Sequence, residues 1–208
     1  MPSTLKQSLQ KLTKEKAPGP SPSFSTYHLL LAIELMADKS VGRNKLAREL
    51  DIGQGAVRTL IGRLRDAGLI TTLKSGCSLT DKGFRLWKEY RSTIKKIGIE
   101  KNELTFADHN VAVLVKNRGQ KVQTGMEQRD AAVMAGAKSA TTILFREGRL
   151  VFPSTIREVD KDFPKASAQI VKLLEPQEND AIVVVSSDSP RRAEYAALAA
   201  AWTLLDNN

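Results

Sequence analysis

Residues 42–68 read GRNKLARELDIGQGAVRTLIGRLRDAG, and this stretch decides the fold of the N-terminal half. Apolar residues recur three and four positions apart on both sides of a central break, which predicts two short helices, 42–50 and 54–67. The break contains Gly53 and Gly55, residues that tolerate a sharp reversal of the chain. Gly68 follows the last periodic residue, as is typical of a helix C-cap. The pattern therefore predicts a helix-turn-helix.

The flanking segments extend this motif. Upstream, 25–36 is a strongly apolar helix, with Ser23 or Ser25 as its N-cap. Downstream, the segments 69–73 and 77–80 predict two short strands joined by a turn that contains Gly76.

A further helix is expected over 81–97, with Thr80 as its N-cap. A hairpin that follows the second helix of such a motif forms a wing, so residues 23–98 are predicted to be a winged helix-turn-helix domain. Residues 1–22 read as a polar arm and linker, with Leu5, Leu9 and Leu12 at helical spacing.

The positive charge of the chain lies in this half. Residues 1–100 hold 18 Lys and Arg against 9 Asp and Glu, whereas residues 101–208 hold 14 of each. The whole net charge of +9 therefore belongs to the first 100 residues. A basic module with a helix-turn-helix predicts that its partner is double-stranded DNA.

The second helix of the motif is expected to lie in the major groove. Its inward side is predicted from the apolar residues Val57, Leu60, Ile61 and Leu64. The outward donors can reach base edges or phosphates, while cations on the preceding helix and on the wing are expected to face the DNA backbone. The predicted DNA-binding residues are Arg43, Lys45, Arg48, Gln54, Arg58, Thr59, Arg63 and Lys74.

These segments also carry a family resemblance. Residues 42–50, followed by 55–64 and 68–70, resemble the winged helix-turn-helix of prokaryotic transcription regulators, and Leu79-Thr80-Asp81-Lys82-Gly83 resembles the element after the wing. Within that superfamily, residues 41–83 are most similar to archaeal regulators that join this domain to an uncharacterised α/β C-terminal domain. Residues 125–132 and 141–145 are similar to the same archaeal group. The resemblance implies DNA binding and adds no catalytic chemistry.

The second half alternates strands and helices. The expected elements, in a domain over 105–208, are strand 110–116, helix 125–136, strands 140–146 and 149–152, helix 162–174, strand 181–185 and helix 189–205. The order βαββαβ is that of the ferredoxin-like split βαβ, here with one extra C-terminal helix. A different small mixed sheet fits the pattern nearly as well. The fold class is therefore α+β.

Two polar loops in this half are candidate ligand sites. In 124–130 a glycine-containing loop leads into a helix, where free backbone N–H groups and Arg129 could hold an anion. The loop 186–192 follows an apolar strand, at the end where ligands of open α/β sheets bind. Ordinary helix capping is the favoured explanation of both loops. The candidate residues are Thr124, Gly125, Gln128, Arg129, Ser187, Asp188 and Arg191.

The composition excludes several classes of protein. Cys77 is the single cysteine, so no internal disulfide framework exists, and two histidines, His28 and His109, are too few for a His-based metal cluster. We expect no metal and no cofactor. No apolar run approaches the roughly 18–20 residues of a membrane span, and the polar N-terminus lacks the core of a signal peptide. The expected location is the cytoplasm.

The sequence thus predicts a non-enzymatic transcription regulator that binds DNA as a homodimer. Its C-terminal domain is expected to dimerise or to sense a small-molecule effector. Two alternatives stay open at this point. In one, the C-terminal domain is an enzyme for a nucleotide or small anion, which requires convergent titratable groups in a pocket. In the other, the winged helix is a protein–protein adaptor, which requires an apolar patch over the Arg58–Arg63 face.

Overall fold

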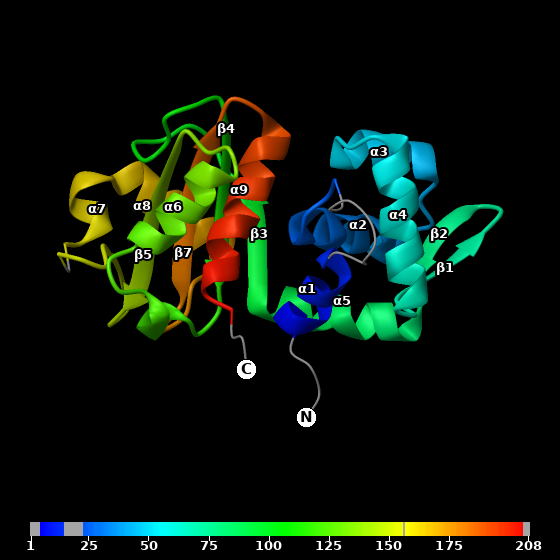
Figure 1. The fold of residues 1–208 in the computed structure, drawn as a ribbon. Helices are drawn as coiled ribbons and strands as arrows, with labels where there is room; N and C mark the ends of the chain where they lie inside the picture. Colours follow the sequence, from blue (N-terminus) through cyan, green and yellow to red (C-terminus); the bar gives the residue numbers. More distant parts are fainter. Residues whose placement is uncertain (1–4, 15–22, 156, 206–208) are drawn as a thin grey trace. The chain divides into compact units, whose positions relative to one another are not determined.

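The computed structural model describes residues 5–14, 23–155 and 157–205. The chain divides into two compact units between Arg91 and Ser92 (Figure 1). Helices and a two-stranded hairpin make up the N-terminal unit, and a five-stranded sheet with helices makes up the C-terminal unit. The predicted α+β class is confirmed.

The N-terminal unit is a winged helix. Its elements are α1 (Leu5–Thr13), α2 (Thr26–Asp38), α3 (Arg43–Leu50), α4 (Gln54–Asp66), β1 (Ile70–Leu73), β2 (Gly76–Leu79) and α5 (Asp81–Thr93). The strands β1 and β2 pair antiparallel and form the wing. The four apolar residues predicted to face inward from α4 are all buried, as are Leu46 and Leu50 of α3. The helical periodicity therefore predicted this core correctly.

The turn between α3 and α4 uses a different residue from the expected glycines. Asp51 is the C-cap of α3 and adopts the left-handed conformation, with φ of 54°. Its short polar side chain makes that conformation accessible. Gly53, by contrast, is the N-cap of α4 with an extended φ of −63°, which other residues also adopt.

Ser25 is the N-cap of α2, and His28 completes a capping box with it. The backbone N–H of Ser25 donates to Nδ1 of His28 over 3.0 Å, and the Ser25 hydroxyl lies 2.8 Å from the same nitrogen. Burial lowers the pKa of His28 to about 4, although the nearby charge of Asp51 acts in the opposite direction. The neutral imidazole is therefore the form that caps the helix.

Acidification should weaken the N-terminal unit through His28. The unfolded chain binds the proton at the ordinary pKa of 6.5, whereas the folded chain binds it at about 4. This contribution to stability is therefore complete above pH 6.5 and is lost as the pH falls to about 4. We expect the free energy of unfolding to decrease by roughly 1–2 kcal/mol over that range, allowing for the partial exposure of the ring.

Urea unfolding at several pH values measures this effect. In the variant His28→Gln the side chain keeps a hydrogen-bond acceptor for the cap but does not titrate. The variant should therefore lose this part of the pH dependence. An identical pH dependence in the two proteins would contradict the assignment.

The C-terminal unit is built on an antiparallel sheet. The strands are β3 (Ile94–Gly98), β4 (His109–Val115), β5 (Ser139–Arg146), β6 (Arg149–Val151) and β7 (Ala181–Ser187). Their order in the sheet is β3-β4-β7-β5-β6, and every neighbouring pair is antiparallel. The helical elements are η1 (Gly119–Lys121), α6 (Met126–Met134), α7 (Val159–Asp162), α8 (Pro164–Leu174) and α9 (Pro190–Thr203).

The order βαββαβ along the chain is confirmed for β4 to β7. Because β7 pairs antiparallel with both β4 and β5, these two strands run parallel with β7 between them, which makes β4–α6–β5 a split βαβ unit. The strand order differs from the ferredoxin-like one, in which the first and third of the four strands lie inside the sheet. Here the second and fourth, β5 and β7, lie inside, and the short β6 forms an edge.

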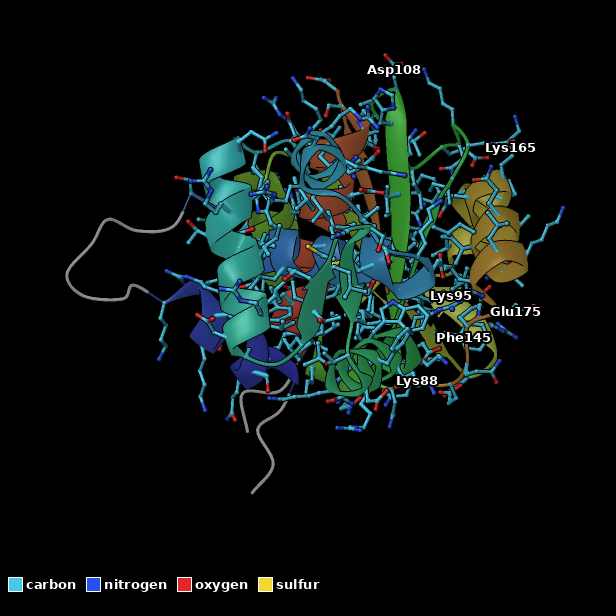
Figure 2. All side chains as sticks on the ribbon, turned by 90° about the vertical axis from the view of Figure 1, so that its right-hand side faces the viewer. Lys88, Lys95, Asp108, Phe145, Lys165 and Glu175 are labelled. Atoms are coloured by element: carbon cyan, nitrogen blue, oxygen red, sulfur yellow. The ribbon has the colours of Figure 1, made fainter. Side chains whose placement is uncertain are left out.

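The strand β3 corrects one prediction. The helix expected over 81–97 ends at Thr93, and Ile94–Gly98 pair with β4 instead. Ile94 and Ile97 are three residues apart, a spacing that also suits a helix, so the local pattern was misleading. Lys95 of this strand donates to the carbonyl of Leu174 over 3.1 Å and lies 3.7 Å from Glu175 (Figure 2). The sheet therefore begins several residues before the predicted end of the winged helix at 98.

Two helical layers cover the two faces of the sheet. Alternate residues of β4 and β7, such as Ala112 and Val184, share a core with Ala166 and Ile170 of α8. The helices α6 and α9 lie side by side on the other face (Figure 1). The alanines of α9 are buried there, so its small residues serve packing within the unit. Among the described residues, no helix combines the length and apolarity that a membrane crossing requires.

Candidate nucleic-acid interface

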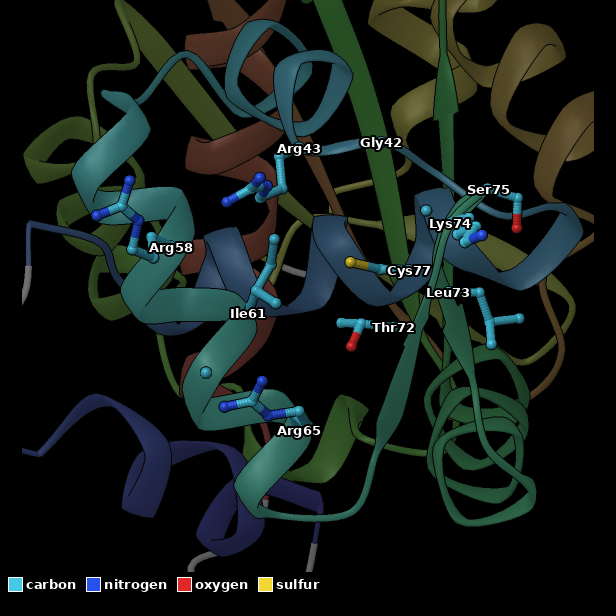
Figure 3. Close-up of a pocket in the computed structure, with 12 residues that line it drawn as sticks. Gly42, Arg43, Arg58, Ile61, Arg65, Thr72, Leu73, Lys74, Ser75 and Cys77 are labelled. Atoms are coloured by element: carbon cyan, nitrogen blue, oxygen red, sulfur yellow. The ribbon is translucent and has the colours of Figure 1, made fainter.

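A hollow of about 460 Å³ separates α4 from the wing (Figure 3). All of its lining lies within the N-terminal unit, on the N-terminal end of α3, the outer face of α4 and the hairpin. The lining residues are Gly42, Arg43, Arg58, Ile61, Gly62, Arg65, Thr72, Leu73, Lys74, Ser75, Gly76 and Cys77.

Four cations line this hollow. Arg58 and Arg65 are seven residues apart on α4 and therefore share one face, while Arg43 begins α3 and Lys74 lies in the turn of the wing. All four side chains are exposed, and in Figure 3 Arg43 and Arg65 lie beside the space between α4 and the wing, whereas Arg58 extends from α4 away from the wing. Within the described ranges, Arg43, Arg58 and Lys74 form no ion pair with a carboxylate. Their charge is therefore available to an anionic partner.

The wing is held in place by a backbone contact. Residues Val41 and Cys77 exchange two N–H to carbonyl hydrogen bonds of 2.9 Å, which attach β2 to the segment before α3. Gly76 has a φ of 130°, and a Cβ atom there would lie 2.8 Å from the backbone of Val41. Only glycine permits this close approach. The attachment fixes Lys74 opposite α4.

The remaining side chains that line the hollow include no reactive group. Cys77 is 3% exposed, and burial raises the pKa of its thiol, although the nearby Arg43 charge favours the thiolate. A protonated buried thiol is a poor nucleophile. Ile61 adds an apolar side chain to the wall. The hollow therefore offers positive charge and shape rather than a catalytic group.

Most of the predicted DNA-binding residues are exposed on the surface of this unit. Three of them, Arg43, Arg58 and Lys74, line the hollow. The other exposed ones do not line the hollow; they lie on α3 or α4, and they are Lys45, Arg48, Gln54 and Thr59. The Thr59 hydroxyl donates to the carbonyl of Gly55 over 3.1 Å, so its oxygen keeps free lone pairs for a donor.

The prediction for Arg63 is wrong. Its side chain is 8% exposed, and its guanidinium donates to the carbonyl of Leu12 over 2.6 Å and to that of Lys14 over 2.8 Å. The same group lies over the ring of Phe24, 5.5 Å from its centroid. Arg63 therefore binds the C-terminal end of α1 and is not presented to DNA.

Arg65 was missed as a site residue. It is exposed, lines the hollow and lies 4.0 Å from Asp66, a long separation for an ion pair. The seven-residue spacing from Arg58 was the available signal, because residues two turns apart lie on the same helix face.

In the first candidate ligand loop, residues 124–130, Gly125 and Gln128 are packed against the rest of the C-terminal unit. Gly125, the N-cap of α6, has a φ of 83°, and a Cβ atom there would lie 2.8 Å from the side chain of Thr142. Gln128 is 1% exposed and donates to the hydroxyl of Thr203 over 2.7 Å. Thr124 accepts from the N–H of Met126 over 3.3 Å. Thr124 and Arg129 are the exposed members of this group, and Arg129 lies 3.7 Å from Asp130.

The second candidate loop is engaged in the same way. Ser187 is 1% exposed and donates to the carbonyl of Gly136 over 2.8 Å. Asp188 lies 2.9 Å from Lys138, and Arg191 donates to Glu194 over 2.8 Å. These contacts support helix capping and surface ion pairing as the role of both loops.

The structure does not bring the two loops together. Gly125 begins α6, whereas Ser187 contacts Gly136, which follows the other end of that helix. No group of three or more His, Cys, Asp and Glu side chains in the described part of the chain could hold a metal.

Two family models match the chain. Residues 106–204 match the family described as a domain of unknown function (DUF4443), and residues 29–85 match the model described as PH0730-like, N-terminal domain. No curated protein compared with the chain matches it.

Three solved structures are similar in different degrees. The hypothetical protein PH0730 from Pyrococcus horikoshii OT3 matches with a TM-score of 0.72 and 25% identity, over 88% of this chain and 93% of that one. ZitR from Lactococcus lactis is 26% identical over 38% of this chain and 58% of that one, with a TM-score of 0.31. BusR from S. agalactiae, in complex with its busAB-promotor DNA, is 13% identical over 87% and 98%, with a TM-score of 0.26.

The similarity to the Pyrococcus protein agrees with the archaeal resemblance of the sequence. The N-terminal unit is thus similar to PH0730-like N-terminal domains, and the chain as a whole shares the fold of the Pyrococcus protein.

Proposed function

We propose that this protein is a DNA-binding transcription regulator whose helix α4 enters the major groove of a DNA duplex. The observation that carries the proposal is that four exposed cations, Arg43, Arg58, Arg65 and Lys74, line the hollow between α4 and the wing. In a winged helix, that space is where the edge of the groove and a phosphate strand pass between recognition helix and wing. The cations supply the donors that phosphates and guanine edges accept.

The two sides of the hollow have different tasks in this proposal. Arg58 projects from the middle of α4 and can donate to O6 and N7 of a guanine through its planar fork. Lys74 on the wing is a compact charge that suits a phosphate and carries little sequence information. Gln54 and Thr59 are exposed along α4 and add donors and acceptors for base edges.

The two alternatives receive less support. An adaptor requires an apolar docking surface. The hollow beside Arg58 carries four cations, and Leu73 is its one large apolar side chain that is exposed. An enzyme requires convergent titratable groups at one of the two polar loops. There Gln128 and Ser187 are turned inward, and Asp188 and Arg191 are engaged by neighbours.

Binding of the full chain to duplex DNA across a salt series tests the proposal. Six exposed cations of α3, α4 and the wing are available for phosphates: Arg43, Lys45, Arg48, Arg58, Arg65 and Lys74. If each contacts one, the logarithm of the association constant should fall with the logarithm of salt concentration with a slope of about −5 per bound copy. Fluorescence anisotropy of a labelled duplex measures the slope.

Selection of bound fragments from a random DNA pool then identifies the preferred sequence. An enriched motif together with the steep slope supports a sequence-reading regulator. A protein that leaves every duplex unbound in dilute buffer would refute the proposal.

Two finer features belong to the same proposal. We infer that the protein acts as a homodimer and that its C-terminal unit responds to a small-molecule effector. The support for self-association is the exposed apolar side of α6, where Met126, Val133 and Met134 are 50%, 44% and 89% exposed. Sedimentation equilibrium of the wild type and of Val133→Glu tests the homodimer, and a monomer in both proteins would contradict it.

A ligand screen by thermal shift tests whether the C-terminal unit binds a small-molecule effector. A screen in which no compound stabilises the protein would count against the effector.

A further inference from the structure

Helix α1 is attached directly to α4. The guanidinium of Arg63 binds two carbonyls at the C-terminal end of α1, those of Leu12 and Lys14. Leu9 of the same helix is fully buried, and the Thr13 hydroxyl lies 3.4 Å from that of Thr26 in α2. The first helix is therefore a fixed part of the N-terminal unit.

The attachment lies on the opposite side of α4 from the wing. Each residue of a helix is rotated by about 100° about the helix axis from the one before it. Seen from Arg58, Ile61 and Arg65 therefore lie toward the wing, whereas Arg63 lies about 140° around α4 in the opposite direction. Thr59, which is exposed, lies between Arg58 and Arg63 on that side. The exposed stripe of α4 therefore has the wing along one border and α1 along the other, as Figure 3 shows with α1 in dark blue.

The end of α1 at this border is positively charged. Lys11 lies in the last turn of α1 and Lys14 follows it, and both side chains are exposed. Arg63 binds the carbonyl of Leu12 in that turn and the carbonyl of Lys14 just after it, and so offsets part of the negative end of the helix dipole.

We propose that α1 is a second flank of the interface and that Lys11 and Lys14 contact backbone phosphates on the side of α4 away from the wing. Arg63 is the positioning residue of this flank, since it holds the end of α1 and does not touch DNA. The proposal rests on DNA binding as the proposed function. It assigns a role to the first helix, which lies outside the winged-helix motif.

The test compares two double variants of the full chain on the same duplex. Lys11→Ala with Lys14→Ala should reduce the steepness of the salt slope by about 2 and lower the affinity about 10-fold near physiological salt. The selected DNA motif should stay the same, because phosphate contacts carry no sequence information. Lys101→Ala with Lys172→Ala is the matched control, since it removes two exposed cations of the C-terminal unit and should change neither quantity.

A second comparison tests the role of Arg63. Adding Arg63→Ala to the Lys11→Ala, Lys14→Ala variant should leave the salt slope unchanged, provided that circular dichroism shows an intact fold. A further decrease in the steepness of the salt slope would mean that Arg63 itself contacts DNA, and would overturn its assignment as a positioning residue.

The outcomes separate this inference from the proposed function. If the wild type binds and Arg58→Ala weakens binding while the Lys11→Ala, Lys14→Ala variant matches the wild type, the second flank is refuted and the proposed function stands. If the wild type binds no duplex at all, the proposed function fails and the second flank fails with it.

Discussion

Replacement of Arg58 and Arg65 together by alanine should lower the affinity for the selected duplex about 100-fold. Both side chains line the hollow from one face of α4, so their loss removes the two cations that α4 contributes to the hollow. Each contact is expected to contribute about 1–3 kcal/mol, depending on whether it reaches a base or a phosphate. The steepness of the salt slope should also fall, by about 1 for each phosphate contact removed.

Competition against unrelated DNA separates the two kinds of contact. Loss of discrimination between the selected motif and unrelated duplexes indicates a base contact, whereas a uniform loss indicates phosphates. The Lys101→Ala, Lys172→Ala control removes the same net charge elsewhere and should bind as the wild type does. Equal binding by the Arg58→Ala, Arg65→Ala variant and the wild type would show that α4 is not the binding helix.

Substitution of Gly83 by alanine should destabilise the N-terminal unit by about 2–4 kcal/mol. Gly83 is buried in the first turn of α5, and a Cβ atom there would lie closer than 3.0 Å to the carbonyl oxygen of Leu69. That oxygen accepts the N–H of Thr80 over 3.0 Å, so moving it away also weakens the contact that closes the wing. Overpacking and a lost buried hydrogen bond together give the expected magnitude.

The matched control is Gly62→Ala, in the interior of α4. A Cβ atom at Gly62 would meet nothing within 4 Å, so this variant should be as stable as the wild type or up to about 1 kcal/mol more stable, as helix propensity predicts. Urea unfolding followed by circular dichroism measures both variants. A Gly83→Ala protein with wild-type stability would show that α5 and the wing are packed less tightly than described.

The sequence predicted the N-terminal unit because its signals are local. The three-and-four periodicity of 42–67 set both the buried side of α4 and most of the exposed side, and Gly76 marked the turn of the wing. The failure at Arg63 has a clear physical origin. Its partners are backbone carbonyls of Leu12 and Lys14, about fifty positions earlier, and a carbonyl leaves no trace in the sequence.

In the C-terminal unit, by contrast, much of the fold depends on contacts between residues far apart in the sequence. The periodicity of the sequence predicts the order of its strands and helices, but it does not predict which strands pair, because no local pattern places β7 between β4 and β5. For the same reason the sequence predicts a helix end at the residues of β3, which form a strand only through pairing with β4. The candidate ligand loops were identified from glycine and hydroxyl residues, which serve caps as readily as ligands.

The central place of β7 has a consequence for synthesis. This strand is the last of the sheet to leave the ribosome, yet both β4 and β5 form their ladders with it. Until residue 181 emerges, neither strand has that neighbour, and each keeps one edge of unpaired backbone N–H and C=O groups, although the helices and wing of the N-terminal unit end at Thr93. The nascent chain is thus most exposed to aggregation and chaperone capture in this interval.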